Sequence, residues 1–267
     1  MVFALDPRIH RVWRTPHVLQ FGVDRPVLTL DDVTIAEERM LVALAAGTTL
    51  PGLRLAAGKG TDAATVERFL ERVAVVLSPG RPATRRELVI VDGAGPVSAL
   101  LLSILREEGM DVRNGLAWDD PAVPLADAAV IVAGFAVPPD RHRRWLQHDV
   151  PHLPVVFGDD EVQVGPFVRP GLGPCLTCAD LQRTDDDPQW PALATQLFDR
   201  PPQRESVLIT ALASAAAALA LVDALRNGPS HDAKGSAPSV SVDYRTGQRR
   251  ERWWRRHPAC GCGGLSG

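Results

Sequence analysis

The first part of the chain changes from short alternating runs to apolar positions at helical spacing. Three extended runs, each ended by turn residues, predict a small antiparallel sheet over residues 8–14, 18–23 and 26–30. Helical spacing then predicts a helix over residues 35–45 and, after a break with glycine and proline, a second over residues 62–77. Together these elements predict a winged-helix unit over residues 1–78.

A polar stretch rich in proline, glycine and arginine, residues 79–86, predicts a linker. After it, the apolar run at residues 88–91 leads through a glycine turn into an apolar helix that ends near Glu108. Apolar runs then alternate with a helical segment, at residues 128–133, 140–148 and 155–157. This rhythm predicts an α/β, Rossmann-like domain over residues 87–267, with a parallel sheet covered by helices.

The remaining pattern predicts a long loop over residues 170–191, a core helix over residues 207–222, a polar connector over residues 228–238 and a final hairpin. Strands over residues 240–244 and 248–254 form that hairpin. Alanine fills seven of the 16 positions of the core helix, too weak an apolar content for a membrane span. No membrane association is predicted.

Composition narrows the function classes. The 267 residues are 45% hydrophobic and 23% charged, which favours a globular protein. A net charge of −3 provides no general attraction to nucleic acid, and the arginine- and tryptophan-rich segment 249–256 is better explained by solvated arginines around a packed tryptophan. The start of the chain has no apolar run typical of a secretory signal, so a cytoplasmic location is expected.

A glycine turn follows the first strand of the second domain. Gly93-x-Gly95-x-x-Ser98 stands where a nucleotide phosphate would meet the amino end of a helix. The alternative is a tight turn that binds nothing, because a serine replaces the third glycine and Pro96 removes one N–H. A nicotinamide dinucleotide would need an acid about 20 residues on, and only Asp111 is available.

Four cysteines occur in two close pairs, Cys175-x-x-Cys178 and Cys260-x-Cys262, and none is left over. In a reducing compartment this arrangement predicts a structural zinc site with four thiolate ligands, closed to substrate. A redox pair is the alternative, and His257 could replace one thiolate because Cys-x-Cys is a tight spacing.

Other polar clusters carry weaker signals. The acidic run Asp185-Asp186-Asp187 predicts a solvated loop that caps the next helix rather than a metal site. The histidines outside the cysteine region have no serine, cysteine or acid at a recognisable spacing, so the sequence predicts no nucleophilic triad.

Five motifs follow one another along the second domain. They are Gly93-Ala94-Gly95, Val164-Gly165-Pro166-Phe167-Val168-Arg169-Pro170-Gly171, Pro174-Cys175-Leu176-Thr177-Cys178, Asp187-Pro188-Gln189-Trp190-Pro191 and His257-Pro258-Ala259-Cys260-Gly261-Cys262. In this order they resemble the ThiF-like family related to ubiquitin-activating enzymes. More narrowly, they are similar to its bacterial branch associated with thiazole/oxazole peptide cyclodehydratases and leader-peptide binding.

The resemblance implies an amino-terminal winged-helix domain, similar to the peptide-binding protein PqqD, that captures a leader peptide as an added strand. We expect this strand to add along residues 26–30, an edge with unpaired backbone groups beside an apolar helix. The expected peptide-binding residues are Val27, Leu28, Thr29, Val66, Phe69, Leu70 and Val73.

Active ThiF-like enzymes adenylate a carboxylate with ATP and magnesium, and the resemblance implies which groups they need. These are an Asn/Arg-rich segment after the second strand, a lysine on the next helix and a magnesium-binding aspartate at a later strand end. This sequence has no lysine between Lys59 and Lys234, has Ala133-Gly134-Phe135 at the later strand end, and keeps only an echo of the Asn/Arg segment in residues 111–115.

The leading hypothesis is therefore a catalytically degenerate scaffold that binds a leader peptide and presents it to a partner, such as a YcaO-type cyclodehydratase. An active adenylyltransferase is the second hypothesis, and an NAD(P)-binding oxidoreductase is the third. Expected partners are a peptide or protein client, a modification enzyme and a second copy in a homodimer. The expected cofactor is zinc, whereas ATP and magnesium belong to the second hypothesis.

Overall fold

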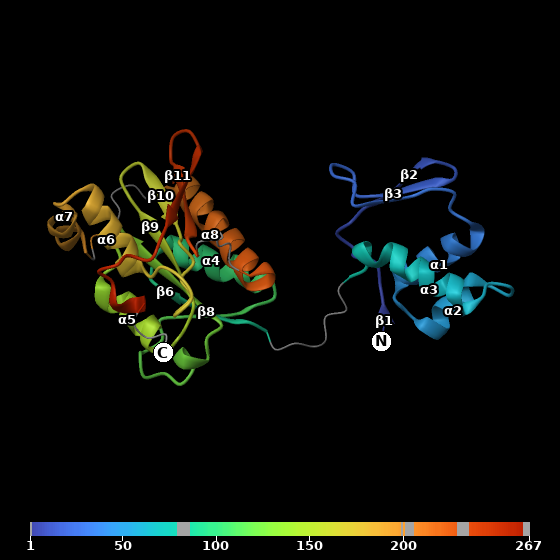
Figure 1. The fold of residues 1–267 in the computed structure, drawn as a ribbon, viewed down its shortest axis with the longest axis horizontal. Helices are drawn as coiled ribbons and strands as arrows, with labels where there is room; N and C mark the ends of the chain where they lie inside the picture. The colour runs from blue at the N-terminus through green and yellow to red at the C-terminus, as the bar shows by residue number, and fades with distance from the viewer. Residues whose placement is uncertain (1, 79–85, 199, 201–205, 229–234, 264–267) are drawn as a thin grey trace. The chain divides into compact units, whose positions relative to one another are not determined.

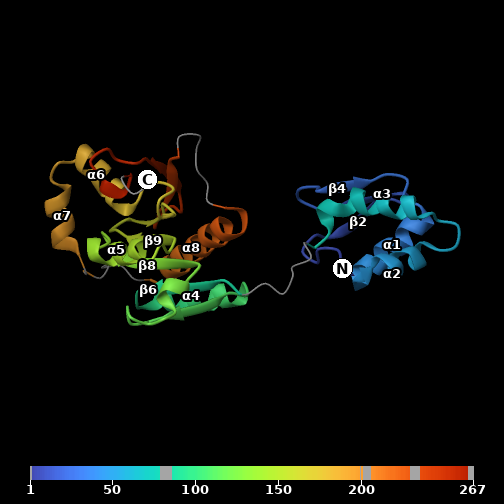
Figure 2. The ribbon, with the colours of Figure 1, turned by 60° about the horizontal axis from the view of Figure 1, so that its bottom comes forward.

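The computed structural model describes residues 2–78, 86–198, 200, 206–228 and 235–263. Its contacts divide the chain into two compact units, Met1–Arg85 and Arg86–Gly267, called here the first and second units. Each is described by itself (Figures 1 and 2). Most of the predicted linker, residues 79–86, lies outside the described residues.

The first unit begins with strands. An antiparallel sheet joins β2 (Arg11–Thr15), β3 (Val18–Phe21) and β4 (Leu28–Leu30) in that order, with β3 in the middle. A short pair, β1 (Val2–Phe3) with β5 (Thr48–Thr49), ties the start of the chain to the helical part. The three predicted extended runs therefore form one sheet, whose two edges belong to β2 and β4.

Three helices and one 3₁₀ turn complete the first unit: α1 (Ile35–Ala46), α2 (Leu50–Ala57), α3 (Ala63–Val73) and η1 (Ala74–Val76). The prediction of a break between α1 and α3 was wrong, because α2 occupies it. Pro51 falls in the first turn, where a missing N–H costs nothing, and the Thr49 hydroxyl accepts from the Gly52 N–H. The winged-helix assignment stays a prediction.

In the second unit, seven strands form one mixed sheet in the order β12-β11-β10-β9-β8-β6-β7. The parallel part consists of β6 (Leu88–Asp92), β7 (Asp111–Asn114), β8 (Ala128–Gly134) and β9 (His152–Phe157). The antiparallel part consists of β10 (Glu161–Val164), β11 (Ala237–Asp243) and β12 (Arg249–Trp254). The predicted final hairpin is confirmed, whereas the prediction of a parallel sheet holds for only four of these strands.

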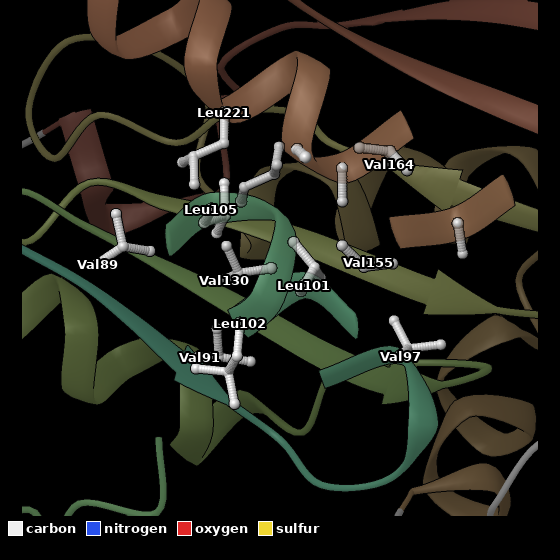
Figure 3. Close-up of a cluster of buried hydrophobic side chains, with 14 of the residues drawn as sticks. Val89, Val91, Val97, Leu101, Leu102, Leu105, Val130, Val155, Val164 and Leu221 are labelled. Carbon is white, nitrogen blue, oxygen red and sulfur yellow. The ribbon is translucent and has the colours of Figure 1, made fainter. Parts of the chain in front are cut away.

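Alternation along β6 assigns the helices to the two faces of this sheet. Val89 and Val91 face α4 (Pro96–Glu107) and α8 (Val207–Asn227), in the cluster of Figure 3. Leu88 and Ile90 face the opposite cluster, which includes side chains of α5 (Pro139–Gln147) and α6 (Leu176–Asp186). Both faces of the parallel strands are thus covered, as continuous apolar runs require.

The prediction of a long loop over residues 170–191 was wrong, because α6 occupies its centre and α7 (Trp190–Leu197) begins at its end.

Among the helices described, α8 alone is long and apolar enough to cross a membrane by length and composition. One face of α8 packs on α4, β9 and β10, as predicted for a core helix, while Val207, Leu208 and Leu219 are exposed on its other side. Two 3₁₀ turns, η2 (Val123–Leu125) and η3 (Gly261–Gly263), complete the unit.

Candidate functional site

The four cysteines, although 81 residues separate the two pairs in sequence, come together in the second unit. Their sulfur atoms all lie within 4.8 Å of one another, at 3.6 Å for Cys175–Cys260 and 3.3 Å for Cys178–Cys262. A tetrahedral zinc ion with Zn–S bonds of about 2.3 Å would hold its sulfurs about 3.8 Å apart. The donor set therefore fits a four-thiolate zinc site, as predicted from the spacing.

Local structure explains why each sulfur points inward. Cys175 is the N-cap of α6 and Cys178 lies in its first turn, so the two thiols share one face beside the positive end of the helix. The other pair follows β12, where η3 curves the chain back. Four thiolates would fill every coordination position of such an ion. When bound, it would therefore have a structural role and cross-link α6 to the segment after β12.

Four thiols this close cannot ionise independently. A hydrogen bond from the Cys175 thiol lowers the pKa of Cys178 to about 4, while that bond and burial raise the pKa of Cys175. Burial raises the pKa of Cys262 to about 11. The thiolate form is therefore favoured most at Cys178, and a bound cation would stabilise the thiolate form of all four.

The segment after β12 is also held to α6 by polar contacts. The Arg252 guanidinium contacts the Asp186 carboxylate at 2.6 Å, and His257 Nε2 lies 3.0 Å from the Asp185 carboxylate. The second ring nitrogen of His257 accepts from the Ala259 N–H at 3.1 Å. Because both ring nitrogens are already hydrogen-bonded, neither is free to coordinate a metal. Asp185 and Asp186 form the end of α6 and not the predicted loop.

The glycine turn lies between β6 and α4, where the sequence placed it, but two of its three residues serve packing. A Cβ on Gly93 would come within 2.8 Å of the Val132 side chain, so only glycine lets β6 and β8 approach here. Ser98 is 1% exposed and its hydroxyl donates to the Ala94 carbonyl. Gly95 alone, with φ +94° and open space around it, faces outward at the amino end of α4.

Beside the turn, a cleft of about 630 Å³ opens at the carboxyl ends of β6 and β8. Trp118 and Trp145 line it, with ring centroids 4.9 Å apart in an edge-to-face arrangement. Clefts at this end of a parallel sheet are where ligands of such folds bind. The position and volume would suit a nucleotide, so the polar groups of the cleft decide its chemistry.

Asp92, the last residue of β6, supplies a carboxylate to this cleft. The Arg141 guanidinium donates to it at 2.9 Å and the Trp145 indole N–H donates at 3.1 Å. The same guanidinium also donates to the main-chain carbonyls of Asp92, at the end of β6, and Val132, in the neighbouring strand β8. A carboxylate neutralised in this way is a poor ligand for magnesium. Sequence analysis missed this arrangement, although an acid directly after a strand was a visible signal.

Among the described residues that line the cleft there is neither a lysine nor a second carboxylate, and Arg200 is the one cation besides Arg141. The end of β8 brings Ala133 and Gly134 to its wall, without a carboxylate. Asp111, the acid considered for a dinucleotide ribose, begins β7 and so lies at the opposite end of the strand from the cleft, paired with Arg113 at 3.1 Å. This placement removes the observation on which the oxidoreductase hypothesis depended.

In the first unit, the residues predicted to bind a peptide lie at and next to β4, an edge strand, and on α3. Leu28 is half-buried, while Thr29 and Val27 are exposed, and β4 is an edge of the sheet. Of the four α3 residues assigned to the groove, only Leu70 is half-buried rather than buried. The other three are buried in the core of the unit: Val66, Phe69 and Val73.

The Val27 N–H donates to the Phe21 carbonyl at 2.8 Å, so it faces β3 and not the open edge. A proline at this position would damage the sheet itself. Side-chain substitutions therefore test the groove better than a backbone substitution at Val27.

No protein-family model matches this sequence, and no curated protein is similar enough to count as a relative. Solved structures do match. The structure of the heterocyclase TruD aligns with 98% of this chain at TM-score 0.70 and 16% identity, and a heterocyclase in complex with substrate and cofactor aligns with 99% at 0.72 and 15%. This chain spans less than half of those chains, 43% and 40%.

The microcin C7 biosynthetic enzyme MccB in complex with N-formylated MccA aligns over its whole length with 99% of this chain, at TM-score 0.57 and 12% identity. Structures of E. coli MccB also match. The resemblance predicted from the order of the motifs is thus confirmed at the level of fold, which this chain shares with heterocyclase and MccB structures.

Proposed function

We propose that this chain is a catalytically degenerate ThiF-like scaffold of the cytoplasm, which binds a leader peptide and presents it to a separate modification enzyme. The cleft in the second unit carries this proposal. Its carboxylate, Asp92, is already bound by Arg141 and Trp145, and neither a lysine nor a second carboxylate lines the part of the cleft that the structure describes. Adenylation needs such groups to hold magnesium and neutralise phosphate charge.

The first unit supports the peptide-binding half of the proposal. The β4 edge offers backbone groups to an added strand, and Leu70 provides an apolar contact beside it, within a unit that we assign to the winged-helix type. Structures with similar folds include MccB in complex with N-formylated MccA and a heterocyclase in complex with substrate. This chain matches less than half of each solved heterocyclase, and the partner that we propose for it is a YcaO-type cyclodehydratase.

Nucleotide binding tests the degenerate half. Purified full-length protein is titrated with ATP and magnesium by calorimetry, and ATP–pyrophosphate exchange is measured with peptides that co-purify from the native cell. We expect neither binding nor exchange. Exchange that disappears in Gly95→Asp would overturn the proposal.

Peptide binding tests the other half. Peptides that co-purify with the full-length protein are titrated into wild type and two glutamate variants. Leu70→Glu places a charge in the half-buried groove and should weaken binding at least about tenfold. Leu55→Glu, at an α2 position that is 84% exposed, should leave binding unchanged. Equal affinities in the three proteins would show that the β4 groove is not the peptide site.

One observation favours an active adenylyltransferase as the second candidate function. The cleft lies where nucleotides bind in such folds, is about 630 Å³ in volume, and is lined by Gly93 and Pro96 at the amino end of α4. Magnesium-dependent ATP binding, competed by AMP, would favour this candidate.

A further inference from the structure

The first unit contains a second groove, on the opposite edge of its sheet from β4. A cavity of about 640 Å³ lies between β2 and α1, and it is within the range of volumes that hold ligands in other proteins. Trp13, Leu41 and Val42 form its apolar wall, and Arg11, Glu38 and Arg39 contribute charge. Neither the sequence motifs nor the proposed function accounts for this groove.

The strand beside the groove is open. All five residues of β2 are exposed, and β2 pairs only with β3 among the described strands, so backbone groups along its other edge are available to an added strand. Trp13 is 47% exposed and Val42 is 69% exposed, unusually high values for such large apolar side chains. An extended segment that paired with β2 would cover both.

Alternation along β2 places particular side chains toward α1. Arg11 and Trp13 are two residues apart and so share a face, and both line the groove. The Arg11 guanidinium reaches across to the Leu41 carbonyl, 3.5 Å away, the long limit of a hydrogen bond. An arginine held this loosely remains able to bind a stronger acceptor.

The charge of the groove identifies the chemistry of its occupant. Arg11 and Arg39 make no ion pair with any described residue, and Glu38 is the one acid among the described residues that line the cavity. A second copy of this chain, pairing β2 with β2, would bring no acid to the arginines of the groove, because the strand Arg11–Thr15 contains none. Acidic side chains on the incoming strand would complement the groove.

We propose that the groove between β2 and α1 docks an extended, acidic segment of a partner protein, which adds to β2 as a strand. One apolar side chain of this segment packs against Trp13 and Val42, and an acidic side chain two residues away binds Arg11 or Arg39. The site is separate from the β4 groove, so the first unit has a docking edge distinct from its client-peptide edge. This inference goes beyond the proposed function and does not depend on peptide binding at β4.

The test uses full-length, isotope-labelled protein and two blocked seven-residue peptides. One has glutamate, leucine and glutamate at alternate positions with threonine between and around them, and the other has lysine in place of glutamate. The acidic peptide should produce saturable NMR shifts at the Trp13 indole N–H and the amides of residues 11–15. The lysine peptide should bind at least about tenfold more weakly, because its charges face the arginines.

Two variants and a control assign the effect to the groove. Arg39→Glu should weaken binding of the acidic peptide and strengthen that of the lysine peptide, a reversal that simple loss of folding cannot produce. Trp13→Ala should abolish the peptide-induced shifts of the amides of residues 11–15, while the amide signals of α3, in the same unit, stay as in wild type. Leu55→Glu, outside the groove, should bind as wild type.

Three results of the peptide titrations would overturn the proposal. They are the absence of saturable shifts at millimolar peptide, equal affinity for both peptides, and shifts confined to β4 and α3. Shifts along β2 that depend on protein concentration without peptide would also overturn it, because a second copy would then occupy the edge. Failure here leaves binding of client peptides at β4 intact, so the two proposals fail separately.

Discussion

The four-cysteine cluster and the cleft beside the glycine turn both lie in the second unit, but they differ in whether their polar groups are free to bind a ligand. At the cluster, four sulfurs from α6 and the end of the chain converge with no partner other than one another and the nearby backbone. In the cleft, the carboxylate of Asp92 is bound by Arg141 and Trp145, and Ser98 is turned into the core. A motif retains its chemistry only where its polar atoms remain free for a ligand.

The largest expected effect is loss of the metal. Cys178→Ala should remove zinc from the protein, as measured by elemental analysis, and leave three buried or half-buried thiols without a common ligand. The loss of several kcal/mol should lower the Tm of the second unit by roughly 10 °C or more. His257→Ala should retain one zinc per chain. If elemental analysis finds no zinc in the wild-type protein, the four-cysteine cluster is not a zinc site and the comparison with the cleft fails.

Acid should destabilise the second unit around α5 and the start of β9, where His142 and His152 are buried. Burial lowers the pKa of His142 to about 3 and that of His152 to about 4, so both rings are neutral when folded and bind protons on unfolding. Stability should therefore be complete above pH 6.5 and fall as the pH decreases toward 4, by about 3 kcal/mol per histidine.

The His152 Nδ1 atom lies 2.9 Å from the Val150 carbonyl and donates to it, a bond that an asparagine amide can reproduce without a titrating group. His152→Asn should therefore have a flatter dependence of the free energy of unfolding on pH. Denaturant titrations at pH 7, 6 and 5 measure both slopes. Parallel slopes in the two proteins would show that another group controls the acid response.

Removal of the guanidinium from the cleft should have a smaller effect. Arg141→Ala leaves the Asp92 carboxylate, 17% exposed, without its counter-charge and should cost roughly 2–4 kcal/mol in denaturant unfolding. Arg113→Ala, which breaks an exposed pair with Asp111, should cost less than about 1 kcal/mol. Magnesium binding by Arg141→Ala but not by wild type would sharpen the comparison, because it would show that the arginine is what disables the carboxylate.

The smallest expected effect separates the two glycines of the turn. Gly93→Ala should destabilise the second unit by about 1–3 kcal/mol, because its Cβ would meet Val132 at 2.8 Å. Gly95→Ala has open space and should cost about 1 kcal/mol through its positive φ alone. Thermal unfolding of the two variants measures the difference. A larger cost at Gly95 would mean that this residue has a structural partner.

The sequence by itself determined the elements whose signals are local. The strand that ends at Asp92, the helix that ends before Glu108, the final hairpin and the pairing of Cys175 with Cys178 all follow from short-range periodicity and spacing. The same rules failed for α2 and α6, because their glycine, proline and acidic residues are usual loop formers. In the structure, Pro51 lies in the first turn of α2, and Asp186 lies at the end of α6, where it pairs with Arg252 of β12.

Only the tertiary structure decided which candidate groups remain available. Arg141 binds Asp92 although the two are 49 positions apart in sequence. Phe69, which the sequence placed in a peptide groove, is buried in the core. The structure also revealed the groove between β2 and α1, whose residues show no motif. The physical reason is that periodicity fixes which face of an element is apolar, whereas long-range contacts fix which polar atoms and which edges are already satisfied.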